Sequence, residues 1–98
     1  MKIRKRKIMN VIDNKEKQRF EAEVDGKIAF VEYSVEPDVL SLNHTNVPEE
    51  LGGRGIASEM VEAVLMQAEL RGYKVKPNCS FVAKYIQRHP EWQSIVAS

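Results

Sequence analysis

Cysteine is almost absent from this chain, because Cys79 is the only one among 98 residues. It cannot form an internal disulfide, which favours a reducing compartment. The cysteine and the two histidines lie far apart in sequence and lack metal-site spacing, so no metal is expected. Long apolar runs are also absent, since none approaches the roughly 20 residues that span a bilayer. No apolar segment of signal-peptide length follows the basic start. We therefore expect an intracellular, cytoplasmic protein with no membrane partner.

A strong charge of one sign is missing as well. Fifteen basic and 14 acidic side chains leave a net charge of +1, which gives no global argument for nucleic acid or an acidic substrate. Residues 2–7 form a basic run that would suit nucleic acid or an anionic lipid surface, but a solvated, frayed terminus explains it better. The predicted strands lack the exposed aromatic pairs of single-strand binders. We therefore do not expect nucleic acid as a partner.

The apolar content is that of an ordinary globular protein, at 43%. Ninety-eight residues support one domain with one modest core. There are no internal repeats, low-complexity tracts or linkers. We expect a single domain over residues 1–98, with 1–7 as a basic terminus.

The first half of the chain is predicted to form an antiparallel meander of about four strands. Residues 20–24 alternate between apolar and acidic side chains, as a strand with one buried face does. Asp25-Gly26 then makes a two-residue hairpin turn. The following strand is apolar on both faces and should be central. The predicted strands cover residues 8–12, 20–24, 27–35 and 39–45.

The second half changes to helical spacing. A helix is predicted over residues 55–71, with Gly72 as its left-handed C-cap. A short fifth strand at 73–77 and a last helix at 80–88 follow, and His89-Pro90 should end that helix. Strand, helix, strand implies a right-handed crossover, so strand five should lie parallel to strand four. The predicted fold class is α/β, of the mixed α+β kind.

Three glycines, Gly52, Gly53 and Gly55, fall where the first long helix should begin. Glycine lets the backbone bend sharply, and the first amides of a helix point outward with the positive end of its dipole behind them. A strand, a glycine loop and a helix in that order suit a phosphate. The alternative is a flexible turn. The spacing fits neither a Walker loop nor the dinucleotide fingerprint.

The loop Gly52-Gly53-Arg54-Gly55-Ile56-Ala57 resembles the second half of the acyl-CoA-binding loop of the GNAT (general N-acetyltransferase) superfamily. That loop is usually written Arg/Gln-x-x-Gly-x-Gly/Ala, and Gly52 stands where Arg or Gln is usual. Three further segments resemble the small, single-domain GNAT-like acetyltransferases: His44-Thr45-x-Val47-Pro48, Pro77-Asn78-Cys79-Ser80-Phe81-Val82 and Pro90-x-Trp92. The resemblance covers roughly residues 18 to 93.

This resemblance implies that strands four and five splay apart and that the pantetheine arm of acetyl-CoA lies in the gap. Ligands of open α/β sheets bind beyond such strand ends. Backbone groups at residues 43–47 would bond the arm, and residues 53–57 would hold the pyrophosphate. The implied cofactor-binding residues are Asn43, Thr45, Val47, Gly52, Gly53, Arg54, Gly55, Ile56, Ala57, Cys79 and Tyr85.

Cys79 and His44 are the candidate catalytic residues. Cys79 precedes the last helix, a position that lowers a thiol pKa. It could accept the acetyl group, line the thioester pocket or be a small core residue. His44 should share a strand face with Leu40 and Leu42, and it could deprotonate an ammonium or a thiol. It could equally be a structural histidine. The topology allows a Cys–His pair.

Two other side chains also have two interpretations. Arg54 could add a charge-assisted bond to a phosphate or be an exposed loop arginine. Tyr85 occupies roughly the place where many GNAT enzymes keep a tyrosine acid, but a core tyrosine is the better supported interpretation.

The resemblance predicts an acetyl-CoA-dependent N-acetyltransferase that acts directly or through Cys79. GNAT enzymes usually carry two helices between their first two strands, whereas only residues 14–17 separate those strands here. The acceptor side should therefore be open, which suits a peptide or protein amine, or else an acceptor pocket that a partner completes. The alternative is a non-catalytic module that binds CoA or acyl-CoA.

Overall fold

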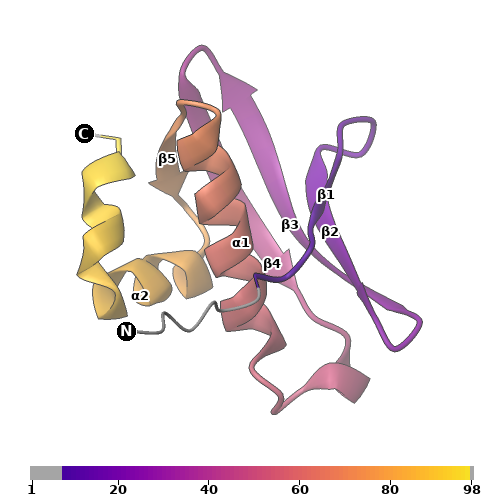
Figure 1. The fold of residues 1–98 in the computed structure, drawn as a ribbon. Coiled ribbons are helices and arrows are strands. Elements are labelled where there is room, and N and C mark those ends of the chain that lie inside the picture. The colour runs from indigo at the N-terminus through magenta and orange to yellow at the C-terminus, as the bar shows by residue number, and fades with distance from the viewer. Residues whose placement is uncertain (1–7, 98) are drawn as a thin grey trace, which may run out of the picture.

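The computed structural model describes residues 8–97, so the basic run at residues 2–7 lies outside the described part (Figure 1). The strands are β1 (Ile12–Asn14), β2 (Arg19–Val24), β3 (Lys27–Glu36), β4 (Val39–Asn46) and β5 (Lys74–Pro77). The helices are α1 (Ile56–Leu70), α2 (Ser80–Arg88) and two 3-10 helices, η1 (Glu49–Leu51) and η2 (Pro90–Ile95).

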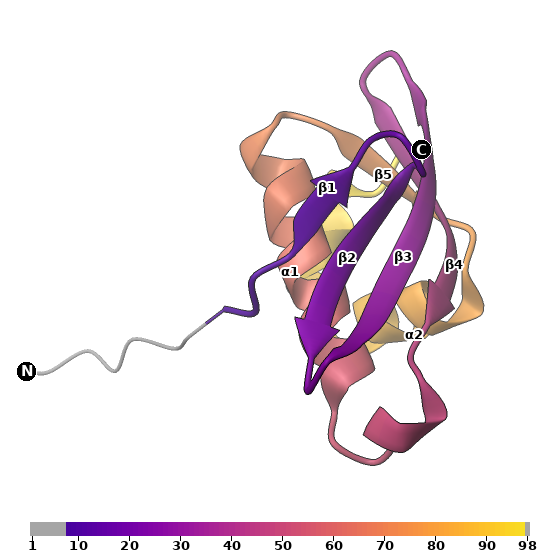
Figure 2. The ribbon, with the colours of Figure 1, turned by 90° about the vertical axis from the view of Figure 1, so that its right-hand side faces the viewer.

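The five strands form one sheet in the order β1-β2-β3-β4-β5. The first four strands are antiparallel, and β5 lies parallel to β4 after the crossover through α1, as predicted. The predicted mixed α/β class and the central place of β3 are confirmed. Figure 2 shows β1, β2 and β3 side by side, with α1 behind them.

The core lies between the sheet and α1. One face of the strands supplies Phe20, Val31 and Leu42, and α1 supplies Met60 and Leu65, all fully buried. Each such side chain contributes about 1.5 to 3 kcal/mol through apolar burial. The inward set predicted for α1 is buried throughout: Ile56, Met60, Val61, Val64, Leu65 and Ala68. Gly72 has the predicted left-handed conformation, with φ 81°.

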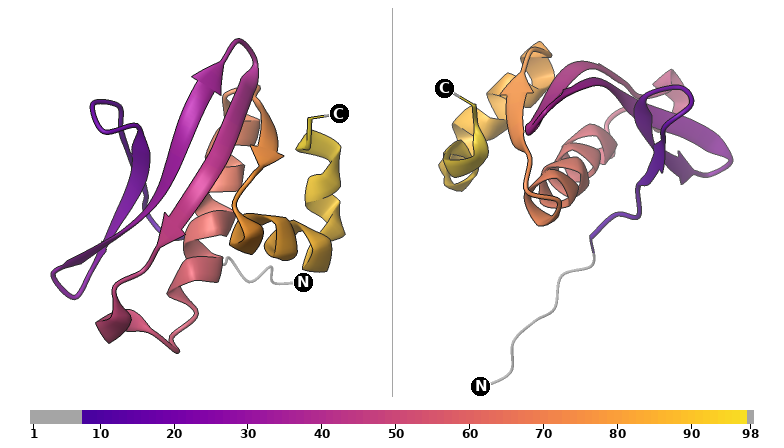
Figure 3. Two further views of the ribbon diagram at one scale, coloured as in Figure 1. Left: turned by 180° about the vertical axis from the view of Figure 1, so that it is seen from behind. Right: turned by 90° about the horizontal axis from the view of Figure 1, so that it is seen from above.

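The opposite face of β3 and β4 is not covered by α1 or α2. Figure 3 shows it from behind, with α1 on the far side of the sheet. Ile28, which belongs to this open face, is 39% exposed. The prediction that β3 is apolar on both faces therefore located its place in the sheet correctly, although only the face with Ala29, Val31 and Tyr33 is buried.

Three details differ from the sequence-based expectations. The first strand is Ile12–Asn14 and not residues 8–12, because its pairing with β2 sets Ile12 opposite Glu21. Neither 3-10 helix was predicted. After η2 the chain adds to the edge of β5, where the Ala97 N–H donates to the Val75 carbonyl at 2.8 Å.

The last long helix, α2, has the predicted bounds, and His89 ends it as expected. Its apolar set differs at one position, because Phe81 is 38% exposed. Across residues 8–97, no helix combines the length and the apolar character needed to cross a membrane.

Candidate cofactor-binding and catalytic site

A β-bulge in β4 determines which side chains reach the site. Tyr33 of β3 pairs with Leu42, but the preceding residue, Glu32, pairs with His44, so Asn43 has no opposite residue. An extra residue of this kind reverses the faces of the residues that follow it. His44 therefore lies on the open face with Glu32. Thr45, opposite the buried Val31, lies on the helix face.

Strands β4 and β5 part just beyond the bulge. Their last pair is Leu42 with Pro77, while β4 continues to Asn46 beside β3 alone. Two bonds close the fork at its base. The Cys79 N–H donates to the Leu42 carbonyl at 2.9 Å, and the Asn78 side-chain amide donates to Asn43 Oδ1 at 3.0 Å. The divergence implied by the resemblance is thus present, with Cys79 at its base.

Cys79 is the N-cap residue of α2, and its thiol is partly buried. The Sγ atom donates a hydrogen bond to Thr45 Oγ1 at 3.4 Å. Burial raises the pKa of the thiol, but hydrogen bonds that the thiolate would accept from the Thr45 hydroxyl and from the backbone amides of Val82 and Phe81 together lower it below its ordinary value. These amides belong to the first turn of α2, and the direction of the shift agrees with that expected for a thiol at a helix N-terminus.

The Cys79–His44 pair that the topology allowed is not formed. The prediction placed His44 on the face of Leu40 and Leu42, and the bulge moves it to the other face. Its exposed ring lies 6.4 Å from that of Phe30, centroid to centroid. The neighbour of the thiol is instead Thr45, which was predicted only as a backbone contact to the cofactor.

Leu51 of η1 lines the cavity beside the glycine loop, and its side chain is fully buried. Gly53 and Gly55 have φ angles of 78° and 73°, which glycine adopts most readily. Gly55 is the N-cap of α1, and its carbonyl accepts from the Glu59 N–H at 3.1 Å. Within residues 8–97, the amides of residues 53 to 58 donate to no protein acceptor. They therefore remain available to an anion.

Two groups of the loop that were predicted to contact the cofactor already form hydrogen bonds within the protein. The Gly52 amide donates to the Glu49 carbonyl at 3.0 Å, so Gly52 shapes the loop and does not present its N–H. The Arg54 guanidinium donates to Asp25 Oδ2 at 2.6 Å, and both side chains are largely exposed. This ion pair ties the loop to the β2–β3 turn. Arginine has five N–H donors, so others remain.

Two neighbouring cavities lie at this end of the molecule. The loop cavity, of about 230 Å³, is lined by Val47, Leu51, Gly52, Gly53, Gly55, Ile56, Ala57, Ser58 and Phe81. The α2 cavity, of about 290 Å³, is lined by Ser58, Phe81, Lys84, Tyr85, Arg88 and His89. Ser58 and Phe81 belong to both, so an extended ligand could pass from one cavity to the other. The exposure of Phe81 follows from its place between them.

Tyr85 is both a core residue and a wall of the α2 cavity. It is buried, and its ring stacks on His89 at 4.1 Å between centroids. The preferred interpretation as a core tyrosine is confirmed. Lys84 and Arg88 were not identified from the sequence, although their spacing of four residues places them on one side of α2. The available signal in the sequence was the pair of basic residues at that spacing on the last predicted helix.

The structure therefore brings together most of the predicted cofactor-binding residues. Val47, Ile56, Ala57 and the three glycines share one cavity, with Thr45 and Cys79 at the nearby strand divergence. Asn43 lies at the bulge, where its side chain donates to Ser34 Oγ. Arg54 and His44 point elsewhere.

Comparison with known proteins agrees with this geometry. Residues 19–95 match the family model described as GCN5-related N-acetyl-transferase. Protein NATD1 of chicken is 32% identical over 66 residues, covering 67% of this chain and 59% of the chicken protein. Protein NATD1 of mouse is 27% identical over 86 residues, covering 84% and 77%. The chain thus spans less than two thirds of the chicken relative.

The fold also has a counterpart among solved structures. A GCN5-like protein from Staphylococcus aureus, solved by NMR, superposes with a TM-score of 0.69 at 22% identity, over 93% of this chain and 90% of that one. At this identity the likeness concerns the fold. The family model covers most of the chain, including the glycine loop, the bulge and Cys79. The chain therefore belongs to the GCN5-related N-acetyltransferase family, a family of acyltransferase enzymes that transfer acetyl groups.

Proposed function

We propose that the chain uses acetyl-CoA as acetyl donor and transfers the acetyl group to a peptide or protein amine. The observation that carries this proposal is the set of unbonded amides at residues 53 to 58 beside the loop cavity. They face a site at the N-terminus of α1, where the helix dipole favours a diphosphate. Bound there, acetyl-CoA would supply an activated acetyl thioester.

The residues around the loop suggest how each part of the donor is held. Gly53, Gly55 and Ala57 would receive the diphosphate on their backbone N–H groups. The α2 cavity, with the cations of Lys84 and Arg88, would receive the 3′-phosphoadenosine end. From the loop cavity, the pantetheine arm would reach the divergence of β4 and β5 along Asn43 to Val47, towards Cys79.

Cys79 and the neighbouring amides would then promote transfer. In the direct route, the acceptor amine attacks the acetyl carbonyl, loses its proton, and CoA leaves as the thiolate. In the covalent route, the Cys79 thiolate attacks first and CoA leaves. The amine then takes the acetyl group from Cys79, which restores the thiolate. The lowered pKa of Cys79 supports the covalent route. In both, backbone amides stabilise the tetrahedral oxyanion.

His44 would act on the acceptor, not on Cys79. Its side chain is on the open face of the sheet, next to the bulge that marks the divergence of β4 and β5. None of the cavities lined by the glycine loop or α2 includes it. An acceptor lysine presented on the open face could therefore meet His44, which would take up its proton. An open surface suits a peptide or protein better than a small amine.

A second candidate function is a CoA-binding module without turnover. One observation favours it: among the described residues, the side-chain hydrogen-bond partner of the Cys79 thiol is Thr45, a hydroxyl that is not a general base. Such a module would keep the affinity for CoA and lack the transfer reaction. The two candidates therefore share a binding site and differ in chemistry.

Two measurements test the proposal together. Titration calorimetry with CoA and acetyl-CoA should give saturable binding, and its absence would overturn both candidates. Intact mass spectrometry after incubation with acetyl-CoA and lysine peptides should show acetylated peptide. An acetyl adduct on the protein that is lost in Cys79→Ala would identify the covalent route, whereas peptide acetylation that survives in Cys79→Ala would identify direct transfer. Binding without any acetylation would leave the CoA-binding module.

A further inference from the structure

A third cavity lies at the opposite end of the sheet from the glycine loop. This turn cavity has a volume of about 270 Å³ and is lined by Asp13, Lys15, Gln18, Tyr33, Val35, Leu40, Arg71 and Tyr73. Leu40 stands near the start of β4 and Tyr73 just before β5, whereas the glycine loop follows the end of β4. In Figure 1 the two ends of α1 are accordingly far apart. The proposed acetyl-CoA site does not use any of these residues.

The polar wall of the turn cavity is a bonded group of three side chains. Tyr33 Oη donates to Asp13 Oδ1 at 2.5 Å, and Arg71 Nη1 donates to Asp13 Oδ2 at 2.8 Å. The Asp13 side chain is only 9% exposed, so these bonds offset the loss of its hydration. Both carboxylate oxygens are engaged. Asp13 therefore organises the wall, and its negative charge is already paired with Arg71.

The two cations that line the cavity, unlike Asp13, can still bind a ligand. Arg71 has five N–H donors, and among residues 8–97 its one side-chain hydrogen bond is to Asp13. Its guanidinium also lies 5.8 Å from the centre of the Phe20 ring, which further fixes its position. Lys15 is exposed at the rim. With Asp13 counted, the lining carries one excess positive charge, which favours an anionic ligand.

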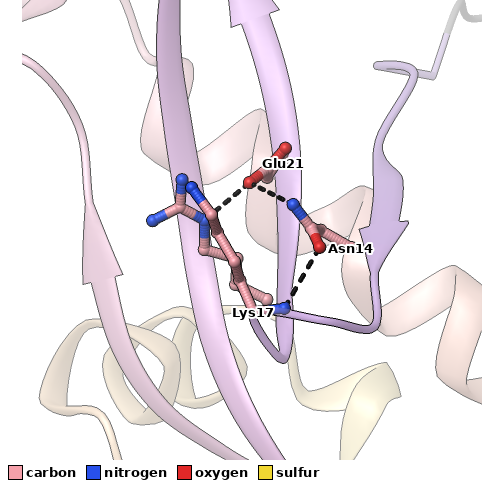
Figure 4. A network of polar contacts seen from close by, with 4 residues as sticks. Asn14, Lys17 and Glu21 are labelled. Atoms are coloured by element: carbon pink, nitrogen blue, oxygen red, sulfur yellow. Dashed lines mark hydrogen bonds and ion pairs between the residues drawn. The ribbon is translucent and has the colours of Figure 1, made fainter.

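The β1–β2 turn that carries Lys15 and Gln18 is itself fixed. Figure 4 shows Asn14 at the centre of this network. Its side chain donates to Glu21 Oε2 at 3.0 Å and accepts the Lys17 N–H at 3.1 Å. Gln18 has a left-handed φ of 53°, and its carbonyl accepts the Tyr33 N–H at 3.0 Å. A preformed rim of this kind reduces the entropy lost when a ligand binds.

The rest of the cavity is apolar. Leu40 is buried, and Tyr73 is half-buried. Val35 is apolar and yet 47% exposed to solvent. A ligand that covers Val35 would remove that apolar surface from water. The volume is slightly below that of the sites that hold drug-sized molecules. The ligand should therefore be small, with an apolar body.

From this arrangement we infer that the turn cavity is a binding site for a small organic carboxylate with an apolar body. The carboxylate lies between Arg71 and Lys15, and the body packs on Val35, Leu40 and Tyr73. Recognition is by charge and apolar contact together: the excess positive charge of the lining disfavours amines, and the apolar floor disfavours inorganic anions. This inference does not depend on the proposed acetyl transfer.

The test is an NMR titration of the full chain, with sodium benzoate as the probe and neutral benzamide as its matched analogue. Benzoate should shift the backbone amides of Lys15, Gln18, Arg71 and Tyr73 saturably, whereas benzamide and benzylamine should not. Lys15→Gln should weaken binding at least fivefold. Lys17→Gln, on the same turn but outside the cavity, should leave it unchanged. Arg71→Gln should weaken binding further, but it also removes the bond from Arg71 to Asp13. Lys15→Gln leaves the Asp13 bonds intact, so it tests the charge of the cavity without disturbing its wall.

Two results would overturn the inference. One is the absence of saturable shifts up to about 10 mM benzoate, well above a 1 mM dissociation constant. The other is equal binding of benzamide, which would show that charge plays no part. Saturating CoA should not displace benzoate, so the outcome is separate from that of the acetyl-CoA proposal.

Discussion

Leu42 and His44 lie two residues apart on β4 but on opposite faces of the sheet. Ordinary strand alternation would place both side chains on one face. The bulge at Asn43 separates them, so Leu42 is buried against the helices and His44 is exposed beside Phe30. The same bulge turns Thr45 towards Cys79. Because of this one extra residue, Thr45 lies on the face of the sheet that carries Cys79, and His44 lies on the open face.

His44→Gln should leave the thiol unaffected and impair transfer. Because His44 and Cys79 lie on different sides of β4, the pH dependence of Cys79 alkylation by iodoacetamide should be the same in His44→Gln and in the parent protein. Acetylation of a lysine peptide should fall by about 100-fold or more, the usual contribution of a general base. Glu32→Gln, on the same open face, serves as the control for a nearby change. A shifted alkylation profile in His44→Gln would contradict the assignment of faces.

Thr45→Val should raise the pKa of Cys79. The hydroxyl of Thr45 bonds the thiol at 3.4 Å and favours its charged form. Without that hydroxyl, less opposes the effect of burial, which raises the pKa of the thiol. The midpoint of iodoacetamide alkylation should therefore move to higher pH in Thr45→Val and stay in place in Thr45→Ser. The parent midpoint should lie below that of a free cysteine peptide. Identical profiles for the valine and serine variants would show that Thr45 does not influence the thiol.

Much of this site was predictable because its signals are local. Glycines at a helix start indicated the loop, and Gly53 and Gly55 do have left-handed φ angles. The bounds of α2 followed from its apolar spacing and from His89-Pro90. The helical spacing of residues 55–71 likewise predicted the crossover, and with it the parallel pairing of β4 and β5. In each case the decisive interaction lies within a few residues of the pattern.

The errors have a different origin. Nothing in the polar run from Asn43 to Asn46 distinguishes a bulged strand from a regular one, because the bulge depends on how β3 pairs with it. The contact between Thr45 and Cys79 joins residues 34 apart, and that between Arg54 and Asp25 joins residues 29 apart. Such contacts follow from tertiary packing, so they cannot be predicted from local sequence patterns.

Gly53→Ala and Gly55→Ala should each reduce both stability and CoA affinity. A side chain in the left-handed region costs roughly 1 to 2 kcal/mol, although a Cβ at either position meets no atom within 4 Å. Relief of that strain would move the amides of residues 53 to 58, so CoA affinity should fall about tenfold, or about 1.4 kcal/mol. Urea unfolding and titration calorimetry measure the two effects.

Gly72→Ala is the matched control for the loop variants. Gly72 has a φ of 81° beyond the C-terminal end of α1, away from the glycine loop, and also has open space around its Cβ position. It should lose a similar free energy of unfolding and keep its CoA affinity. If all three variants lost affinity equally, the effect would come from general destabilisation, and the loop would have no special role in binding.

Lys84→Gln combined with Arg88→Gln should weaken CoA binding through the 3′-phosphate alone. Both residues line the α2 cavity, and their side chains are exposed, so their removal leaves the core of α2 intact. Charge-assisted bonds to a phosphate are stronger than neutral ones. Calorimetry should therefore show at least tenfold weaker binding of CoA and little change for 3′-dephospho-CoA. Raising the salt concentration should reduce the difference between parent and variant, since exposed charges are screened. If both ligands weakened equally, the α2 cavity would not hold the 3′-phosphate, and the adenosine end would have to leave the loop cavity in another direction.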